Sequence, residues 1–136
     1  MVIDTSAVVA ILMDEPEQNI FKQIVAADTN SAMPAMTFYE TSIVMAAKNR
    51  TQAAARLVDD FVRDLAIDIV VAAVDDVVAV REAYFRYGRG YHPAGLNLAD
   101  CFAYALAKTR NEPLLFKGDD FSKTDIVPAW RRGGPS

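Results

Sequence analysis

Short apolar runs alternate with longer amphipathic stretches along this chain. The runs at 2–3, 67–72 and 114–117 are rich in aliphatic residues, a pattern typical of buried strands, and residues 31–35 allow one further brief strand. Between these runs, apolar residues recur at three- and four-residue spacing over 5–13, 16–28, 37–50, 53–65, 75–88 and 98–108, which predicts helices. Strands that alternate with helices predict an α/β domain built on a parallel sheet.

Some of the predicted helices carry recognisable start signals. The segment 14–16, Asp-Glu-Pro, is one, because proline in the first turn of a helix loses no hydrogen bond. Thr37 and Glu40 have the spacing of a capping box, which places Glu40 in the first turn of its helix. Asn97 can cap the helix at 98–108, with Asp100 in its first turn.

Acidic residues occupy related places in this pattern. Asp4 directly follows the first strand, and the pair at 119–120 follows the last one. Glu40 and Asp100 stand just inside helix starts. In a parallel sheet with helical crossovers, strand C-termini and helix N-termini lie at the same edge, where ligands bind. We therefore expect these acids to converge on one crevice, although Asp4, Glu40 and Asp100, taken one at a time, are also typical helix-capping acids.

Converging carboxylates suggest a metal and a hydrolytic reaction. Like charges raise one another's pKa values, and a divalent cation relieves that repulsion. One histidine and one cysteine are too few for a His/Cys zinc site in one chain, so we expect oxygen ligands that bind Mg²⁺, with Mn²⁺ as the alternative. Metal-bound water is a nucleophile, which indicates phosphodiester hydrolysis. Cys101 points about 100° around the helix from Asp100 and is expected to be buried and inert.

Bulk properties indicate one compact domain. The chain has 136 residues, of which 52% are apolar and 24% charged, so it can bury a substantial core. We expect one domain over 1–130 and a flexible C-terminal tail over 131–136. No apolar run approaches the roughly 18 residues that span a bilayer, so we expect no membrane partner and a cytoplasmic location. The net charge of −4 argues against a general nucleic-acid coat protein but not against a nuclease with acidic ligands.

Three segments and one helix carry a family resemblance. Residues 2–7 with Asp4, 97–107 with Asp100 and 114–121 with Asp120, together with Glu40 in an early helix, closely resemble the PIN-domain ribonucleases and, more narrowly, the VapC toxins of bacterial toxin–antitoxin pairs. The resemblance covers nearly the whole chain. It implies a PIN-like, three-layer α/β/α sandwich with a short parallel sheet, and Mg²⁺-dependent endoribonuclease activity.

The resemblance also implies roles for individual residues. Asp4 and Asp100 would be the direct metal ligands, and Glu40 and Asp120 would complete the catalytic pocket. Asp120 is preferred over the aspartate before it, which remains an alternative, because the acid preceding Phe is the steadier one in the family pattern. Ser6 resembles the family's hydroxyl that supports the pocket, and its other interpretation is an ordinary helix cap.

RNA binding would need positive charge near the acids, because backbone contacts supply most of the affinity. Arg86 and Arg89 alternate with aromatic residues over 81–92, where rings could stack unpaired bases, although this stretch is equally an ordinary amphipathic helix end with its loop. Lys117 is a second candidate RNA contact. The family resemblance further implies a VapB-like antitoxin, bound across the helices of the first half and the acidic pocket, and a homodimer.

Other functions remain open on the sequence. A PIN nuclease with a housekeeping RNA-processing or DNA role is the main alternative. A Mg²⁺-dependent phosphoacceptor domain also gathers acids at a sheet edge, but it would need an aspartate at the end of a middle strand, where 67–72 ends in alanine. A non-enzymatic binding module, whose acids serve only as helix caps, is the third alternative.

Overall fold

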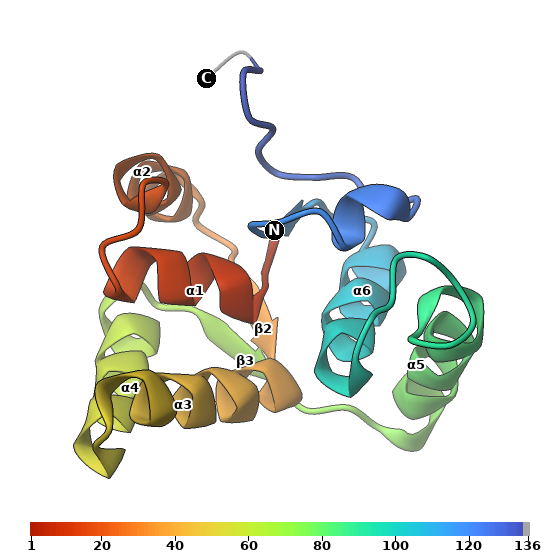
Figure 1. Ribbon diagram of the computed structural model, residues 1–136, viewed down its shortest axis with the longest axis horizontal. Helices are drawn as coiled ribbons and strands as arrows, with labels where there is room; N and C mark the ends of the chain where they lie inside the picture. The colour runs from red at the N-terminus through yellow and green to blue at the C-terminus, as the bar shows by residue number, and fades with distance from the viewer. Residues whose placement is uncertain (135–136) are drawn as a thin grey trace.

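The computed structural model describes residues 1–134, in which a short parallel sheet is surrounded by helices (Figure 1). The strands are β1 (Val2–Ile3), β2 (Ala32–Pro34), β3 (Asp68–Val70) and β4 (Leu114–Leu115). The helices are α1 (Thr5–Leu12), α2 (Gln18–Ala27), α3 (Ala35–Asn49), α4 (Ala55–Asp64), α5 (Val74–Tyr87) and α6 (Leu98–Arg110), with 3₁₀ turns η1 (Gln52–Ala54) and η2 (Phe121–Lys123). The strands predicted at 67–72 and 114–117 are therefore shorter than the apolar runs that indicated them.

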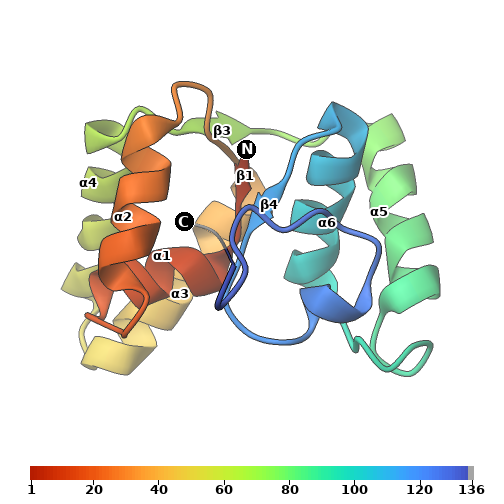
Figure 2. The same cartoon turned by 90° about the horizontal axis from the view of Figure 1, so that it is seen from above.

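The sheet separates two helical layers, as predicted. Its strand order is β3-β2-β1-β4, and all pairings are parallel. Val2 and Leu114 pack into a core with α5 and α6, whereas Ile3 and Leu115 pack on the opposite face with α1 and α2. This alternation follows from the two-residue period of a strand. Figure 2 shows α1–α4 on one side of the strands and α5 and α6 on the other, which confirms the α/β/α sandwich.

The order of the strands explains where a ligand site can form. The chain builds outward from β1 to β2 and β3, then returns to place β4 on the other side of β1. Ligands bind outside the carboxyl ends of parallel strands at such a switch in strand order. Asp4 follows β1, and its backbone N–H donates to Leu115 O at 3.0 Å. The end of β1 and the loop after β4 therefore border the same crevice.

The start of α2 was predicted wrongly. It begins at Gln18 rather than at 14–16. Asp14 has a φ of +55°, and the Glu15 N–H donates to Ala10 O at 3.0 Å, so these residues close the end of α1. Helix ends commonly use one residue in this left-handed conformation. A new helix cannot begin at the residue that terminates the previous one.

The capping box predicted for α3 is also absent. The N-cap of α3 is Pro34, the last residue of β2, and no side chain caps this helix. Thr37 lies inside the helix and is buried, with no hydrogen-bond partner for its hydroxyl. Glu40 is in the second turn. Because β2 runs directly into α3, Glu40 does not bind the backbone N–H groups at the start of this helix. Its side chain is therefore free to contact another part of the molecule.

The segment before the C-terminus pairs with the sheet. The Leu114 N–H donates to Val127 O at 2.9 Å, and the Ala129 N–H donates to Leu114 O at 2.8 Å. Trp130 then packs its ring edge-on against Phe21, with ring centroids 5.3 Å apart. Residues 131–134 are exposed, and positions 135–136 of the predicted tail lie outside the described residues. Over residues 1–134, none of the helices combines the length and the apolar character required to cross a membrane.

Candidate active site

Asp4 is the most buried acid of the predicted set, with only 4% of its surface exposed. It is the N-cap of α1, and its Oδ2 accepts hydrogen bonds from the Ser6 N–H at 3.0 Å and the Ser6 hydroxyl at 2.7 Å. Ser6 Oγ in turn accepts a hydrogen bond from the Lys117 N–H at 2.9 Å, which joins the ends of β1 and β4. Burial raises the pKa of Asp4 to about 6, although the Ser6 hydrogen bonds act in the opposite direction. Asp4 therefore caps α1 and also lies at the end of β1 where the acids were expected, so the two interpretations of this residue are compatible.

Glu40 reaches the same crevice from α3. Its Oε1 accepts a hydrogen bond from the Thr5 hydroxyl at 2.6 Å, and its Oε2 lies 3.4 Å from Asn97 Nδ2. The side chain thus connects α3 to the starts of α1 and α6. These two partners are 35 and 57 residues away along the chain, so only the fold brings them together.

Asp100 stands at the start of α6, where the predicted cap is confirmed. Its N–H donates to Asn97 Oδ1 at 2.7 Å, and its own Oδ2 accepts from the Asn97 N–H at 3.0 Å. Burial raises the pKa of Asp100 to about 7, and the negative charges of Asp4, Glu40 and Asp120 add to that increase. The structure thus places Asp4, Glu40 and Asp120 near enough to Asp100 for their charges to raise its pKa.

The two aspartates after β4 face different neighbours. Asp120 acts on the pKa of Asp100, whereas Asp119 borders a separate hollow with Lys117, Arg131 and Arg132. Both carboxylates are exposed. Phe121, the next residue, is buried and packs against Phe116 at 5.3 Å between ring centroids, which fixes the loop beneath the pair. Of the two aspartates, Asp120 is therefore the one whose charge acts on Asp100, and its role as the fourth acid stays a prediction.

The donor set fits a hydrated divalent cation. Within residues 1–134, no three His, Cys, Asp or Glu side chains come together as a ready-made metal cage. Mg²⁺ usually binds through one or two carboxylates and keeps several waters, so it needs no such cage. Asp4 and Asp100 offer carboxylate oxygen ligands, and burial raises the pKa of both. Carboxylate oxygens are the ligands that hard divalent cations prefer, whereas softer metals prefer sulfur or imidazole ligands.

The predicted RNA-contacting residues differ in their surroundings. Lys117 Nζ lies 2.7 Å from Glu15 Oε1 and 2.9 Å from Glu17 Oε2, so its charge is balanced within the protein. The Arg86 side chain is 61% exposed, and its guanidinium lies over the Tyr87 ring at 4.8 Å and forms a long ion pair of 3.6 Å with Asp125. Arg89 is exposed. Beside these arginines, three rings make mutual edge contacts at centroid distances of 5.4–6.5 Å, namely Tyr84, Phe85 and Tyr91.

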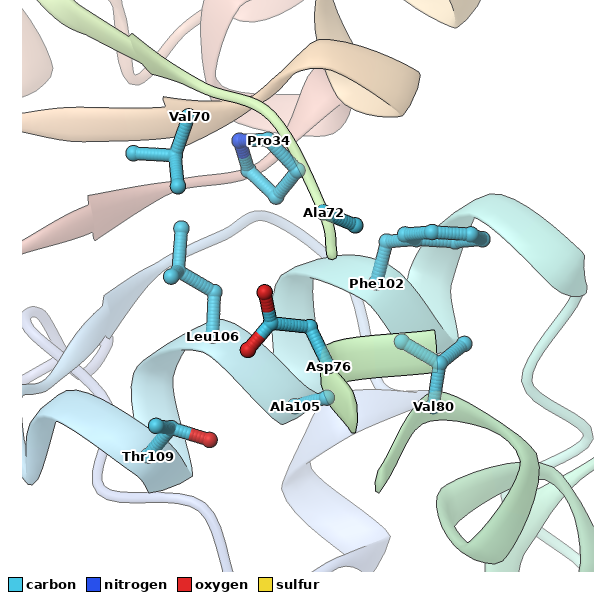
Figure 3. A pocket seen from close by; sticks show the side chains of 9 residues that line it. All are labelled: Pro34, Val70, Ala72, Asp76, Val80, Phe102, Ala105, Leu106 and Thr109. Atoms are coloured by element: carbon cyan, nitrogen blue, oxygen red, sulfur yellow. The ribbon is translucent and has the colours of Figure 1, made fainter. Parts of the chain in front are cut away.

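An apolar pocket lies elsewhere in the molecule. It has a volume of about 60 Å³, and apolar residues such as Val70, Phe102 and Leu106 form most of its wall (Figure 3). Asp76 is the only charged residue in that wall. Cys101 is also fully buried, and burial raises its thiol pKa to about 11, as expected for an inert cysteine. Neither feature contributes to the acidic crevice.

Two polar residues of the crevice were missed in the sequence. Thr5 holds Glu40, and the Asn97 amide reaches the same carboxylate in addition to capping α6. For Thr5, the available signal was its position next to Asp4, because a residue that follows a strand-end acid must also lie near the strand end. The contact itself could not be predicted without knowing that α3 passes alongside α1.

A parallel α/β/α sandwich with carboxylates gathered where the strand order switches defines a PIN-like fold. A PIN-domain family model matches residues 1–127. The chain belongs to the PIN-domain family, and its curated relatives place it with the VapC ribonucleases. PIN-domain ribonucleases generally depend on a divalent metal ion.

The curated relatives align with this chain over almost their whole length. Ribonuclease VapC30 of Mycobacterium tuberculosis is 46% identical over 127 residues, which covers 93% of this chain and 96% of that protein. Ribonuclease VapC of Mycolicibacterium smegmatis is 44% identical over 127 residues, covering 93% of this chain and 98% of its own length. Ribonuclease VapC42 of M. tuberculosis is 42% identical over 130 residues, with 95% and 98% covered.

Solved structures share the fold at low sequence identity. The M. tuberculosis toxin VapC20, described as cleaving the sarcin–ricin loop, superposes with a TM-score of 0.75 at 14% identity and covers 93% of this chain and 95% of its own. A toxin–antitoxin complex from Klebsiella pneumoniae gives a TM-score of 0.66 at 17% identity, with 95% and 97% covered. These similarities extend the agreement in fold beyond the close relatives.

Proposed function

We propose that this chain is the toxin of a type II toxin–antitoxin pair and a Mg²⁺-dependent endoribonuclease that cleaves RNA phosphodiester bonds at its four carboxylates. The observation that carries the proposal is the contact of Glu40 with both Thr5, which follows Asp4, and Asn97, which caps the helix of Asp100. Burial, with the charges of Asp4, Glu40 and Asp120, raises the pKa of Asp100 to about 7, which agrees with this arrangement. A divalent cation would offset the negative charges that act on Asp100. The names of the close relatives agree with this activity.

In this proposal, Asp4 and Asp100 bind Mg²⁺. Bound Mg²⁺ would supply charge neutralisation and an acidified water for attack on phosphorus. The Ser6 hydroxyl, itself fixed by the Lys117 N–H, orients the Asp4 carboxylate. These hydrogen bonds favour the ionised form of Asp4 that a metal ligand requires, against the opposing effect of burial.

Glu40 and Asp120 complete the catalytic pocket. Glu40 is held at Oε1 by the Thr5 hydroxyl, so its position relative to Asp4 is fixed by the first turn of α1. We assign it the removal of the proton from the attacking water. Asp120 stands on the exposed side of the crevice, where its charge acts on Asp100 and where the RNA strand would enter or leave.

The RNA-binding surface that we propose combines Arg86 and Arg89 with the adjacent rings. Phe85 and Tyr91 are 56% and 59% exposed, so their faces are open to unpaired bases. Arg86 can exchange its long ion pair with Asp125 for an RNA phosphate. Lys117 is the second proposed RNA contact, and its amine would have to leave Glu15 and Glu17 to bind a phosphate.

The proposed protein partners are a VapB-like antitoxin and a second copy of the chain. A stripe of exposed apolar residues on α3, formed by Met36, Tyr39 and Ile43, runs beside Glu40 and supports a protein partner that covers the crevice. One structure with the same fold is a toxin–antitoxin complex. A second exposed apolar stripe, with Val74, Val77 and Val78 on α5, supports a homodimer. The proposed substrate implies action in the cytoplasm.

The decisive experiment is cleavage of total RNA by the purified protein. We expect Mg²⁺-dependent cleavage by the wild type, none by Asp4→Asn or Asp100→Asn, and full cleavage by Asp59→Asn, an exposed acid on α4 that serves as the matched control. Single-stranded DNA should remain intact in a parallel reaction. Equal RNA cleavage by wild type and Asp4→Asn would overturn the proposal, and preferred cleavage of DNA would indicate a different nuclease function.

A further inference from the structure

A large hollow lies beside the acidic crevice, on the side of the loop after β4. Its volume is about 580 Å³, roughly ten times that of the pocket in Figure 3 and within the range of sites that bind small organic molecules. Lys117 and Asp119 form one wall, and Trp130, Arg131 and Arg132 form another. The hollow therefore shares with the crevice the loop that also carries the proposed fourth acid.

The C-terminal wall is held in place by the core. Main-chain hydrogen bonds join Leu114 to Val127 and Ala129, so this segment runs next to β4 (Figure 2). Trp130 is anchored edge-on against Phe21 of α2. The two arginines that follow Trp130 lie at the rim of the hollow.

The charges of the hollow favour an anionic ligand. Lys117 Nζ lies 2.9 Å from Glu17 and 2.7 Å from Glu15, so its charge is balanced by these two glutamates. Lys117, with a smaller effect of Arg132, lowers the pKa of Glu17. Arg131 and Arg132 are exposed, and within residues 1–134 neither guanidinium forms an ion pair with a carboxylate. Asp119 is the other charged residue of the wall, so the two arginines face one carboxylate that has no lysine partner there. One guanidinium group can donate two parallel hydrogen bonds to a phosphate group, so phosphate is the anion that these arginines would bind best.

The hollow also has an apolar side. Phe116, Pro128 and Trp130 line it together with the charged residues. A purely ionic site for a metal or a free anion would not need such a wall, whereas the flat face of a nucleobase would. Cationic and aromatic groups in one hollow are the combination that binds a nucleotide.

We propose that this hollow is a subsite for one nucleotide of the RNA adjoining the bond that is cleaved. Arg131 and Arg132 hold the phosphate of that nucleotide, and its base lies against Trp130. The proposal rests on the ribonuclease function proposed above. The hydrogen bond from the Lys117 N–H to Ser6 Oγ connects the wall of the hollow directly to the residue that orients Asp4, so a strand bound at the acids has the hollow next to it.

Trp130 provides a direct readout, because it is the only tryptophan in the chain. We expect uridine and adenosine 5′-monophosphate to quench its fluorescence saturably, and Arg131→Ala/Arg132→Ala to weaken that binding at least about tenfold. The control variant Lys48→Ala/Arg56→Ala removes two exposed cations from α3 and α4 and should bind like the wild type. Thermal melting establishes that both variants fold. No quenching, equal binding by both variants, or equal competition by inorganic phosphate alone would overturn a nucleotide subsite.

Cleavage kinetics separate this proposal from the proposed function. With a single-stranded RNA substrate, we expect Arg131→Ala/Arg132→Ala to raise KM about tenfold and to change kcat by less than about twofold, because these arginines bind the substrate away from the reacting bond. In an Asp4→Asn background, the slope of log affinity against log salt concentration should become shallower by about 0.7 for each phosphate that the variant no longer binds. Wild-type protein that cleaves no RNA would contradict the proposed function, whereas cleavage with an unchanged KM in the variant would contradict only the subsite.

Discussion

The hydroxyl of Thr5 donates a hydrogen bond to Oε1 of Glu40 across 2.6 Å, and the two residues belong to helices on different chain segments. Thr5 is also the residue directly after Asp4. The first turn of α1 therefore positions two of the four acids, one as its N-cap and one through a side-chain contact. The Thr41 hydroxyl lies 3.0 Å from the Thr5 hydroxyl, and Thr41 is fully buried, so it helps to hold the Thr5 side chain in place.

Replacing Thr5 tests whether this contact orients Glu40 for catalysis. Valine has nearly the same shape but no hydroxyl, and a hydrogen bond to a charged group contributes about 1.5–3 kcal/mol. We expect Thr5→Val to lower kcat about 10- to 100-fold with little change in KM, and Thr5→Ser to restore most of the activity. Steady-state cleavage of one defined RNA measures both constants. Equal kcat in wild type and Thr5→Val would show that Glu40 is positioned by other contacts.

The hydrophobic pattern was sufficient to predict an α/β domain with a parallel sheet, and the ends of strands and helices were sufficient to place two acids. Asp4 and Asp100 could be predicted because each stands directly at the boundary of a strand or helix, where local sequence fixes position. Glu40 was placed on the correct helix but in the wrong turn, because the capping-box spacing with Thr37 gives no information about a strand that continues directly into the helix at Pro34. The spacing of residues along a sequence predicts which face of a helix a residue occupies only when the start of that helix is predicted correctly.

Contacts between distant segments could not be predicted. Lys117 pairs with Glu15 at a separation of 102 residues, so its neutralisation depends on how the loop after β4 passes the α1–α2 connection. Trp130 was next to the predicted tail, yet it packs on Phe21 across the molecule. Such contacts follow from the strand order, with β4 beside β1, which the sequence pattern leaves undetermined.

The buried Asp4 makes the stability of the metal-free protein depend on pH. Its pKa is raised from 3.8 to about 6 in the folded state, so the folded state favours the protonated carboxyl. This contribution is complete below about pH 4 and is lost as the pH rises through 6, and a shift of about two units corresponds to about 3 kcal/mol. We expect Asp4→Asn, which carries no charge, to be more stable than the wild type at pH 7.5 by about 1–3 kcal/mol.

Urea unfolding at several pH values measures this difference. The stability advantage of Asp4→Asn over the wild type should be small at pH 4 and should increase up to about pH 7, with EDTA present throughout. Comparing the two proteins removes the effect of the other carboxylates, which titrate in both. An advantage that stays constant across this pH range would show that the Asp4 charge does not oppose folding.

Divalent metal should reverse this effect in the wild type. A metal ligand must be ionised, and the pKa values of Asp4 and Asp100 are raised to about 6 and about 7 in the metal-free protein. Mg²⁺ binding therefore displaces protons, and its affinity should increase as the pH rises from 6 to 8. We expect Mg²⁺ to raise the Tm of the wild type more at pH 8 than at pH 6, and to have little effect on Asp4→Asn or Asp100→Asn. Asp59→Asn should respond like the wild type, and a response that persists in both site variants would place the metal elsewhere.

Asp125 is expected to hold the loop that carries Asp120. Its Oδ1 accepts a hydrogen bond from the Tyr104 hydroxyl at 2.5 Å, and its Oδ2 lies 3.1 Å from Lys108 Nζ and 3.6 Å from an Arg86 nitrogen. The Tyr104 hydroxyl keeps the pKa of Asp125 below its ordinary value, so this anchor is present at neutral pH and is lost on acidification.

Removing that anchor should loosen the loop without unfolding the protein. We expect Asp125→Ala to lower kcat about tenfold, since one strong hydrogen bond to a charged group is removed and Asp120 is no longer held at the crevice. Lys108→Met removes only an exposed ion pair and should cost less than about 1 kcal/mol of stability with little loss of activity. Hydrogen exchange at the backbone amides of 118–126 gives the independent readout. Protection in these amides should fall in Asp125→Ala and stay unchanged in Lys108→Met, and unchanged protection in both would mean that the buried Phe121 alone is sufficient to hold Asp120 in place.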